Sequence, residues 1–133
     1  MEKMQNKEWV FIINPAAGNG YAKTLKPIIE EKIYKYGVNA EVVYSEKPGN
    51  AAELAGHYAD QGSKYIIGVG GDGTFNEIAS ALIHEQRVTV GLVPAGTGND
   101  FIQILGFPDR FEEKHWKVLF EKSIIQMDAG LCN

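Results

Sequence analysis

Hydrophobic residues along this chain occur in two alternating patterns. Short continuous apolar runs, rich in β-branched residues, predict strands that are covered on both faces. Between the runs, apolar residues recur three or four positions apart, which is the spacing of an amphipathic helix. The predicted strands are 9–13, 40–45, a run that begins at 65, 90–93 and 123–128. The predicted helices are 25–36, 51–60, 78–83, a short one at 101–107, and 112–121.

Glycine and proline mark the ends of several of these elements. Pro27 either begins the first helix, with Thr24 nearby as its cap, or kinks it, and Gly37 ends it. Asn50 is a candidate N-cap for the second helix, and Gly62 closes that helix. With these ends, strands and helices alternate along the chain.

The alternation of strands and helices predicts the fold class. It is typical of an α/β fold with three layers, in which an open parallel sheet carries helices on both faces. The length of 133 residues fits one domain with a single core. Open sheets of this kind bind ligands at the carboxyl ends of their strands, so the loops that follow the strands are the expected binding region.

The stretch from Tyr65 to Ile83 carries the strongest chemical signal. An apolar strand runs into four glycines within six residues and then into a helical pattern. These glycines are Gly68, Gly70, Gly71 and Gly73. Glycines allow positive φ and a close approach of the backbone to a ligand. The unpaired N–H groups at the start of the helix favour an anion such as phosphate, and Asp72 adds a carboxylate suited to a divalent cation.

Two further loops of small residues follow predicted strands, one after Asn14 and one after Val93. A parallel sheet brings all three loops to one edge, so we expect them to form one site.

The segment 68–73 also matches the dinucleotide-binding spacing G-x-G-x-x-G. No acidic residue for a ribose follows at 89–94, however, and the strand is not the first of the fold. The first loop also lacks a lysine at Walker A spacing.

Composition narrows the class of protein and its compartment. The apolar fraction of 44% and the charged fraction of 23% are ordinary for a soluble globular protein. The net charge of −4 argues against nucleic acid as a partner. The single cysteine, Cys132, fits a reducing compartment, and no segment resembles a signal peptide or could span a bilayer. We therefore expect a cytoplasmic protein with no transmembrane segment.

Several candidate residues also have simpler structural interpretations. Asp72 and Asp100 are preferred residue types for capping a helix, and for Asp100 capping is favoured over metal binding. Asn14 suits the end of a strand as a turn former. Lys23 and Lys26 fit a solvated helix face better than a phosphate contact.

The three loops resemble the catalytic domain shared by diacylglycerol kinases, sphingosine kinases and ceramide kinase. The matching segments are Asn14-Pro15 with Gly18 and Gly20, then Gly70-Gly71-Asp72-Gly73-Thr74 with Asn76-Glu77, then Pro94-Ala95-Gly96-Thr97-Gly98-Asn99-Asp100-Phe101. The matches extend over nearly the whole chain, from Trp9 to about Met127. The Gly-Gly-Asp-Gly core is shared with NAD kinases, whereas Gly-Thr-Gly-Asn-Asp-Phe points to lipid kinases. The bacterial diacylglycerol kinase branch is nearest, and its nucleotide-binding domain has the predicted fold class.

The resemblance implies ATP binding across the loops and phosphoryl transfer to a lipid hydroxyl such as that of diacylglycerol, a step in phospholipid biosynthesis. Such transfer depends mostly on positioning and charge neutralisation, which glycine loops and Mg²⁺ can supply. Asp72 is implied as catalytic residue and magnesium ligand, and Glu77 as a residue that orients the loop or the ribose. The residues implied to bind ATP are Asn14, Pro15, Gly18, Gly20, Ser45, Gly70, Gly71, Asp72, Gly73, Thr74, Asn76, Glu77, Gly96, Thr97 and Gly98.

Proteins of the resembling family have a second, β-rich domain that supplies the lipid site and a general base. Residues 1–133 lack it, and the apolar Ile124-Ile125 end favours a truncated chain over a complete protein. We expect this chain alone to transfer no phosphate to a lipid at the membrane surface. We also expect self-association into homodimers at high concentration, through an apolar face around 101–107 and the Ile124-Ile125 end. The residues of 101–107 suit core packing better than lipid contact. A complete, non-catalytic nucleotide-binding domain and an NAD kinase-like enzyme are the alternatives.

Overall fold

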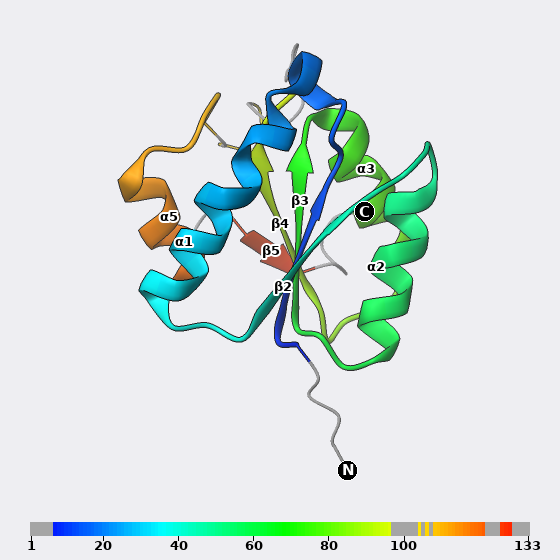
Figure 1. Ribbon diagram of the computed structural model, residues 1–133. Helices are drawn as coiled ribbons and strands as arrows, with labels where there is room; N and C mark the ends of the chain where they lie inside the picture. The colour runs from blue at the N-terminus through cyan, green and yellow to red at the C-terminus, as the bar shows by residue number, and fades with distance from the viewer. Residues whose placement is uncertain (1–6, 97–103, 105, 107, 122–125, 129–133) are drawn as a thin grey trace.

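A five-stranded sheet forms the centre of the computed structural model, in the order β2-β1-β3-β4-β5 (Figure 1). The structure describes residues 7–96, 104, 106, 108–121 and 126–128. The strands are β1 Trp9–Ile13, β2 Ala40–Tyr44, β3 Tyr65–Gly70, β4 Thr89–Pro94 and β5 Gln126–Asp128. Strands β1 to β4 are mutually parallel, which confirms the predicted α/β class.

Strand β5 differs from the expected parallel arrangement, because it pairs with β4 in the antiparallel direction. An edge strand has one neighbour, and either direction satisfies its backbone hydrogen bonds. The alternation of apolar runs and helices therefore could not predict the direction of this strand. The first part of the predicted strand, 123–125, lies outside the described residues.

The described helices cover both faces of the sheet. They are α1 Lys26–Tyr36, α2 Asn50–Asp60, α3 Asp72–Ala81 and α5 Glu113–Phe120. Helices α1 and α5 lie on one face, and α2 and α3 lie on the other, so the three predicted layers are present (Figure 1). Two short 3-10 turns, η1 Ala17–Gly20 and η2 Ala22–Leu25, connect β1 to α1. In the part of the chain that the structure describes, no helix is long and apolar enough to cross a membrane.

Strand β1 anchors the core, since all five of its residues are fully buried. Trp9 and Phe11 project toward the α1 and α5 face, where the ring of Phe120 lies 5.1 Å and 6.0 Å from theirs. Aromatic side chains bury large apolar areas and contribute most where they pack against one another. This packing holds β1 in place, and with it the loop that leaves its carboxyl end.

Ion pairs join α5 to α1 at the surface. The Glu113 carboxylate accepts hydrogen bonds from Lys32, from Lys35 at 2.7 Å and from the Tyr36 hydroxyl at 3.2 Å. The hydrogen bonds from Lys32 and Lys35 lower the pKa of Glu113 to about 2. Both lysines lie on α1, so the ionised carboxylate fastens the first turn of α5 to that helix.

The ends of α1 agree with part of the prediction. Gly37 ends the helix in the left-handed conformation at φ 67°, and Pro27 lies in its first turn, where it begins the helix rather than kinking it. The proposed cap at Thr24 is wrong. Its hydroxyl donates instead to the Tyr21 carbonyl at 2.6 Å, inside the preceding 3-10 turn.

Candidate functional site

The loops that leave the strands meet at the carboxyl edge of the sheet. The Ser45 N–H donates to the Ile13 carbonyl at 2.8 Å, and the Ala95 N–H donates to the Gly70 carbonyl at 2.7 Å. Neighbouring strands therefore stay paired up to the residue where each loop begins. The predicted convergence of loops is confirmed for the residues described.

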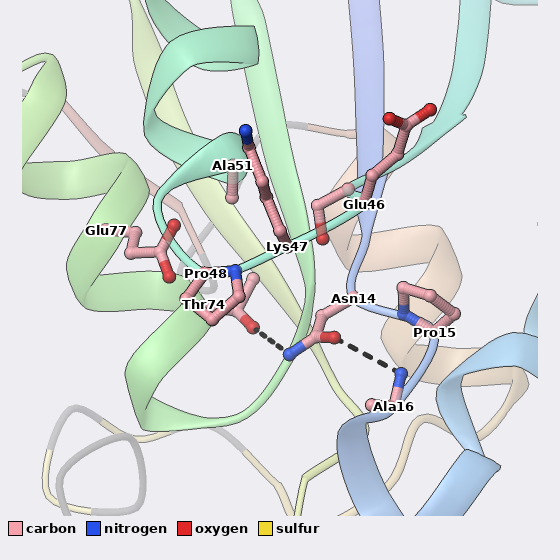
Figure 2. Close-up of a pocket in the computed structure, with 10 residues that line it drawn as sticks. Asn14, Pro15, Ala16, Glu46, Lys47, Pro48, Ala51, Thr74 and Glu77 are labelled. Atoms are coloured by element: carbon pink, nitrogen blue, oxygen red, sulfur yellow. Dashed lines mark hydrogen bonds between the residues drawn. The ribbon is translucent and has the colours of Figure 1, made fainter.

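Asn14 connects the first loop to α3. Its side-chain amide donates to the Thr74 hydroxyl at 3.4 Å, and its side-chain oxygen accepts the Ala16 N–H at 3.2 Å (Figure 2). The second contact is the turn-forming role expected from the residue type. The first contact joins residues 60 positions apart in the sequence, so Asn14 also sets the distance between two loops of the site.

Two of the four glycines around β3 serve close packing, and none of the four has the positive φ expected of them. Positive φ values occur at none of Gly68, Gly70, Gly71 and Gly73. A Cβ on Gly68 would lie 2.9 Å from Ile78, and one on Gly70 would lie 2.8 Å from the Cβ of Thr74. These two glycines let α3 approach β3. At Gly73 a Cβ would meet nothing within 4 Å, so the backbone there is open to a ligand.

Helix α3 begins at Asp72, six residues before the predicted start at 78. Gly71 is its N-cap, in an extended conformation and without a side-chain cap, so Asp72 is the first helical residue and not the cap. A carboxylate in the first turn is favoured by the helix dipole. The described residues contain no group of three or more His, Cys, Asp or Glu that could hold a metal ion. A cation beside Asp72 would therefore find at most one further such side chain among the described residues, and phosphate and water suit the remaining ligand positions.

A pocket of about 320 Å³ opens between the first loop, the β2–α2 loop and α3. It is lined by Asn14, Pro15, Ala16, Ser45, Glu46, Lys47, Pro48, Ala51, Thr74 and Glu77. Five of these, Asn14, Pro15, Ser45, Thr74 and Glu77, were predicted as site residues. The volume falls at the low end of the range for small-molecule sites, which is about 300–1,000 Å³.

Glu77 carries an unmet hydrogen-bonding demand in this pocket. Its Oε1 atom is buried and has no hydrogen-bond partner among the described residues. Figure 2 shows the Glu77 side chain on α3, facing the β2–α2 loop across the pocket. An unsatisfied buried acceptor is destabilising by about 1–3 kcal/mol, and more when it is charged. The pocket therefore favours a ligand that donates a hydrogen bond at this point.

The other predicted site residues that the structure describes do not line the pocket. Gly18 (φ 64°) and Gly20 (φ 96°) adopt positive φ in η1, as expected for glycines of a tight loop. A Cβ on Gly18 would collide with the Ala95 carbonyl, so the first and third loops touch there. Asn76 is exposed on α3, and Gly96 is buried just after β4. The predicted residues Thr97, Gly98 and Asp100, and most of the apolar segment 101–107, lie outside the described residues.

The β2–α2 loop forms more of the pocket wall than was predicted from the sequence. Asn50 was expected to cap α2, but Gly49 is the N-cap at φ 88°, and the Asn50 side chain accepts the Glu46 N–H at 2.8 Å. This bond shapes the wall that brings Lys47 and Pro48 to the pocket. The rule that directs ligands to the carboxyl ends of parallel strands applies equally to this loop and would have found Lys47.

Comparison with known proteins places this site in a family. The sequence pattern of the diacylglycerol kinase catalytic domain matches residues 8–132. A Cronobacter sakazakii protein named "Probable lipid kinase YegS-like" is 44% identical over 96 residues, covering 70% of this chain and 32% of the relative. A Staphylococcus saprophyticus "Diacylglycerol kinase" is 31% identical over 123 residues, covering 92% of this chain and 40% of the relative. The matched part of the chain thus spans about a third of the first relative's length and two fifths of the second's.

The fold has a solved counterpart as well. The crystal structure of a diacylglycerol kinase from Bacillus anthracis str. Sterne superposes with a TM-score of 0.73 at 28% identity, covering 90% of this chain and 45% of that chain. The resemblance seen in the three loop sequences is thereby confirmed, together with the predicted fold class.

Proposed function

Because the chain belongs to the diacylglycerol kinase catalytic domain family, we propose that its carboxyl-edge pocket binds ATP with Mg²⁺. The whole protein then transfers the ATP phosphoryl group to a lipid hydroxyl, such as that of diacylglycerol. The observation that carries the proposal is that Glu77 lines the pocket and that its buried Oε1 atom has no hydrogen-bond partner among the described residues. The two hydroxyls of a ribose are donors of the kind this oxygen lacks.

The start of α3 suits the phosphates of the nucleotide. Helix N-termini offer unpaired backbone N–H groups and a favourable dipole for anions. Gly73 leaves open space in the first turn, and Thr74 is held by Asn14 at 3.4 Å. The phosphates would lie across this turn, with the first and third loops beside them.

Asp72 is the residue we assign to Mg²⁺. The ion usually takes one or two protein carboxylates together with substrate phosphates and water, which agrees with a single acidic residue in the first turn of α3. Phosphoryl transfer requires in-line positioning and neutralisation of charge more than covalent chemistry by the protein. The loops supply the first requirement, and the ion held by Asp72 supplies the second.

The acceptor hydroxyl also needs a base within hydrogen-bond reach. We place that base and the lipid pocket in a second domain of the whole protein, at the surface of the membrane, in line with the 32% and 40% of its relatives that the chain covers. Phosphoryl transfer to diacylglycerol is accordingly a property of the whole protein, and inactivity of this chain alone stays a prediction. Homodimer formation also stays a prediction, because the apolar face proposed for it lies mostly outside the described residues.

Calorimetric titration of ATP tests the proposal directly. The unmodified chain should bind ATP more tightly with Mg²⁺ than with EDTA, and Asp72→Ala should bind equally in both conditions. Glu85→Gln is the matched control, because it removes a carboxylate at the opposite edge of the sheet and should behave as the unmodified chain does. The absence of ATP binding in the unmodified chain would overturn the nucleotide site. Equal Mg²⁺ dependence in Asp72→Ala would remove Asp72 from it.

A further inference from the structure

Arg110, in the segment just before α5, contacts two of the loops at the carboxyl edge. Its guanidinium lies 4.4 Å from the centre of the Tyr21 ring, in a cation–π arrangement. Its Nη1 donates to the Gly96 carbonyl at 3.1 Å and to the Asp109 carbonyl at 2.8 Å. One half-buried side chain thus holds a ring from the first loop and a carbonyl from the third.

The backbones of these two loops are in close contact beside Arg110. Gly18 has φ 64°, and a Cβ there would collide with the Ala95 carbonyl and lie 3.1 Å from the Cβ of Tyr21. No side chain fits between the loops at this point. Beside this contact the Arg110 side chain joins the two loops, because it stacks on the Tyr21 ring and donates to the Gly96 carbonyl.

The arginine side chain is chemically suited to this position. A planar guanidinium can stack on an aromatic ring and donate in its own plane at the same time. A lysine ammonium at the same place keeps the charge but loses the planar fork. Replacement by lysine should therefore not restore the contacts.

We propose that Arg110 is a positioning residue of the nucleotide site, which holds the first and third loops at the separation where both contact the phosphates of ATP. The inference rests on the proposed function. Arg110 does not line the pocket between β1, β2 and α3, so it acts through the two loops and not by direct contact there. The phosphates would be affected more than the nucleoside, because small-residue loops hold anions through backbone N–H groups.

The test compares the unmodified chain with four single-substitution variants: Arg110→Ala, Arg110→Lys, Tyr21→Leu and Tyr21→Phe. ATP and AMP are titrated with Mg²⁺ below the unfolding temperature of every variant, and amide hydrogen exchange is followed over residues 17–25. Arg110→Ala and Arg110→Lys should each bind ATP about tenfold more weakly, the scale of one charged hydrogen bond, with AMP changed much less. Exchange over 17–25 should rise. Tyr21→Phe keeps the ring and should match the unmodified chain.

A double substitution sharpens the result. If Tyr21 and Arg110 act through one contact, their effects on ATP affinity are coupled. The double variant, Tyr21→Leu combined with Arg110→Ala, should then lose less ATP affinity than the product of the two single fold-losses. ATP binding by the unmodified chain together with an unchanged Kd in Arg110→Ala would overturn this assignment alone. Equal weakening of ATP and AMP binding in Arg110→Ala would also overturn it. So would an ATP affinity in Arg110→Lys equal to that of the unmodified chain. Failure of the unmodified chain to bind ATP would overturn the proposed function and this inference with it.

Discussion

Two pockets of nearly equal size lie at opposite edges of the sheet, and they differ in how their polar groups are satisfied. The amino-edge pocket, of about 340 Å³, is lined by Ala59, Asp60, Gly62, Ser63, Lys64, Glu85, Arg87 and Val88. There Arg87 pairs with Glu85 at 3.2 Å, and the Ser63 hydroxyl donates to the Lys7 carbonyl at 2.6 Å. In the carboxyl-edge pocket, of about 320 Å³, the buried Oε1 of Glu77 has no partner among the described residues.

Volume therefore does not distinguish the candidate site from a surface hollow. A buried polar atom without a hydrogen-bond partner among the described residues does. The two edges differ because the helices of the fold run in a fixed direction relative to the sheet. In a parallel α/β unit the helices begin at the carboxyl edge and end at the amino edge, so unpaired N–H groups gather only at the first. Figure 1 shows α3 beginning where β3 ends. An anion is favoured at that edge, whereas the helix C-termini at the other edge favour cations.

The largest expected effect comes from filling the open space at the start of α3. Gly73→Val should weaken ATP binding at least about a hundredfold, because a branched side chain would occupy the place of the phosphate. The fold should remain stable, since a Cβ at this position meets nothing within 4 Å. Calorimetric titration measures the Kd, and thermal unfolding checks the fold.

Lys64→Ala in the amino-edge pocket is the comparison for that substitution. It should leave the ATP affinity unchanged, because Lys64 lies at the edge of the sheet opposite the proposed nucleotide site. An unchanged affinity in Gly73→Val would show that the start of α3 does not contact phosphate. A loss of ATP affinity in Lys64→Ala would show that the amino edge also contributes to nucleotide binding.

A smaller effect, of about tenfold, is expected from Glu77→Gln, on the scale of one hydrogen bond to a charged group. The unmodified chain should bind 2′,3′-dideoxy-ATP more weakly than ATP, and Glu77→Gln should discriminate between the two less. Titrations of both nucleotides into both proteins measure this coupling, with Glu85→Gln as the control. If discrimination against the dideoxy nucleotide is the same in both proteins, Glu77 does not contact the ribose.

The smallest effect concerns an ion pair remote from both pockets. Hydrogen bonds from Lys32 and Lys35 lower the pKa of Glu113 from 4.5 to about 2, so the folded state favours its ionised form. The stabilisation is fully present above about pH 5 and is lost as the pH falls through the folded pKa. Urea unfolding at pH 7, 5, 4 and 3 should show Glu113→Gln less stable at pH 7 and the difference shrinking with acidity.

High salt should reduce the same difference at neutral pH, since the pair is exposed. ATP affinity should not change in Glu113→Gln, because the side chain fastens α5 to α1 away from the pocket. A stability difference that grows on acidification would contradict the assigned pKa shift. A change in ATP affinity would show that the α1–α5 contact is coupled to the carboxyl edge.

Much of the fold could be predicted from local patterns, and about half of the pocket lining was predicted from the family resemblance of the loop sequences. Trp9 to Ile13 form a buried strand because an apolar run without alternation must be covered on both faces. Asn14 and Thr74 were predicted as site residues from the resemblance of their loops to the diacylglycerol kinase family, and the structure joins their side chains at 3.4 Å. The role of Gly70 was not predicted correctly, since a glycine needed for positive φ and one needed for close packing are identical in sequence.

The sequence by itself determined the order of strands and helices, the α/β class and the edge where function is expected, because each follows from periodicity and from the direction of parallel strands. Only the tertiary structure decided that Oε1 of Glu77 has no hydrogen-bond partner within the described part of the chain, that β5 runs antiparallel, and that Arg110 reaches both Tyr21 and Gly96. These are contacts between residues far apart along the chain. They leave no periodic trace in the sequence, because they depend on how packed elements place individual side chains.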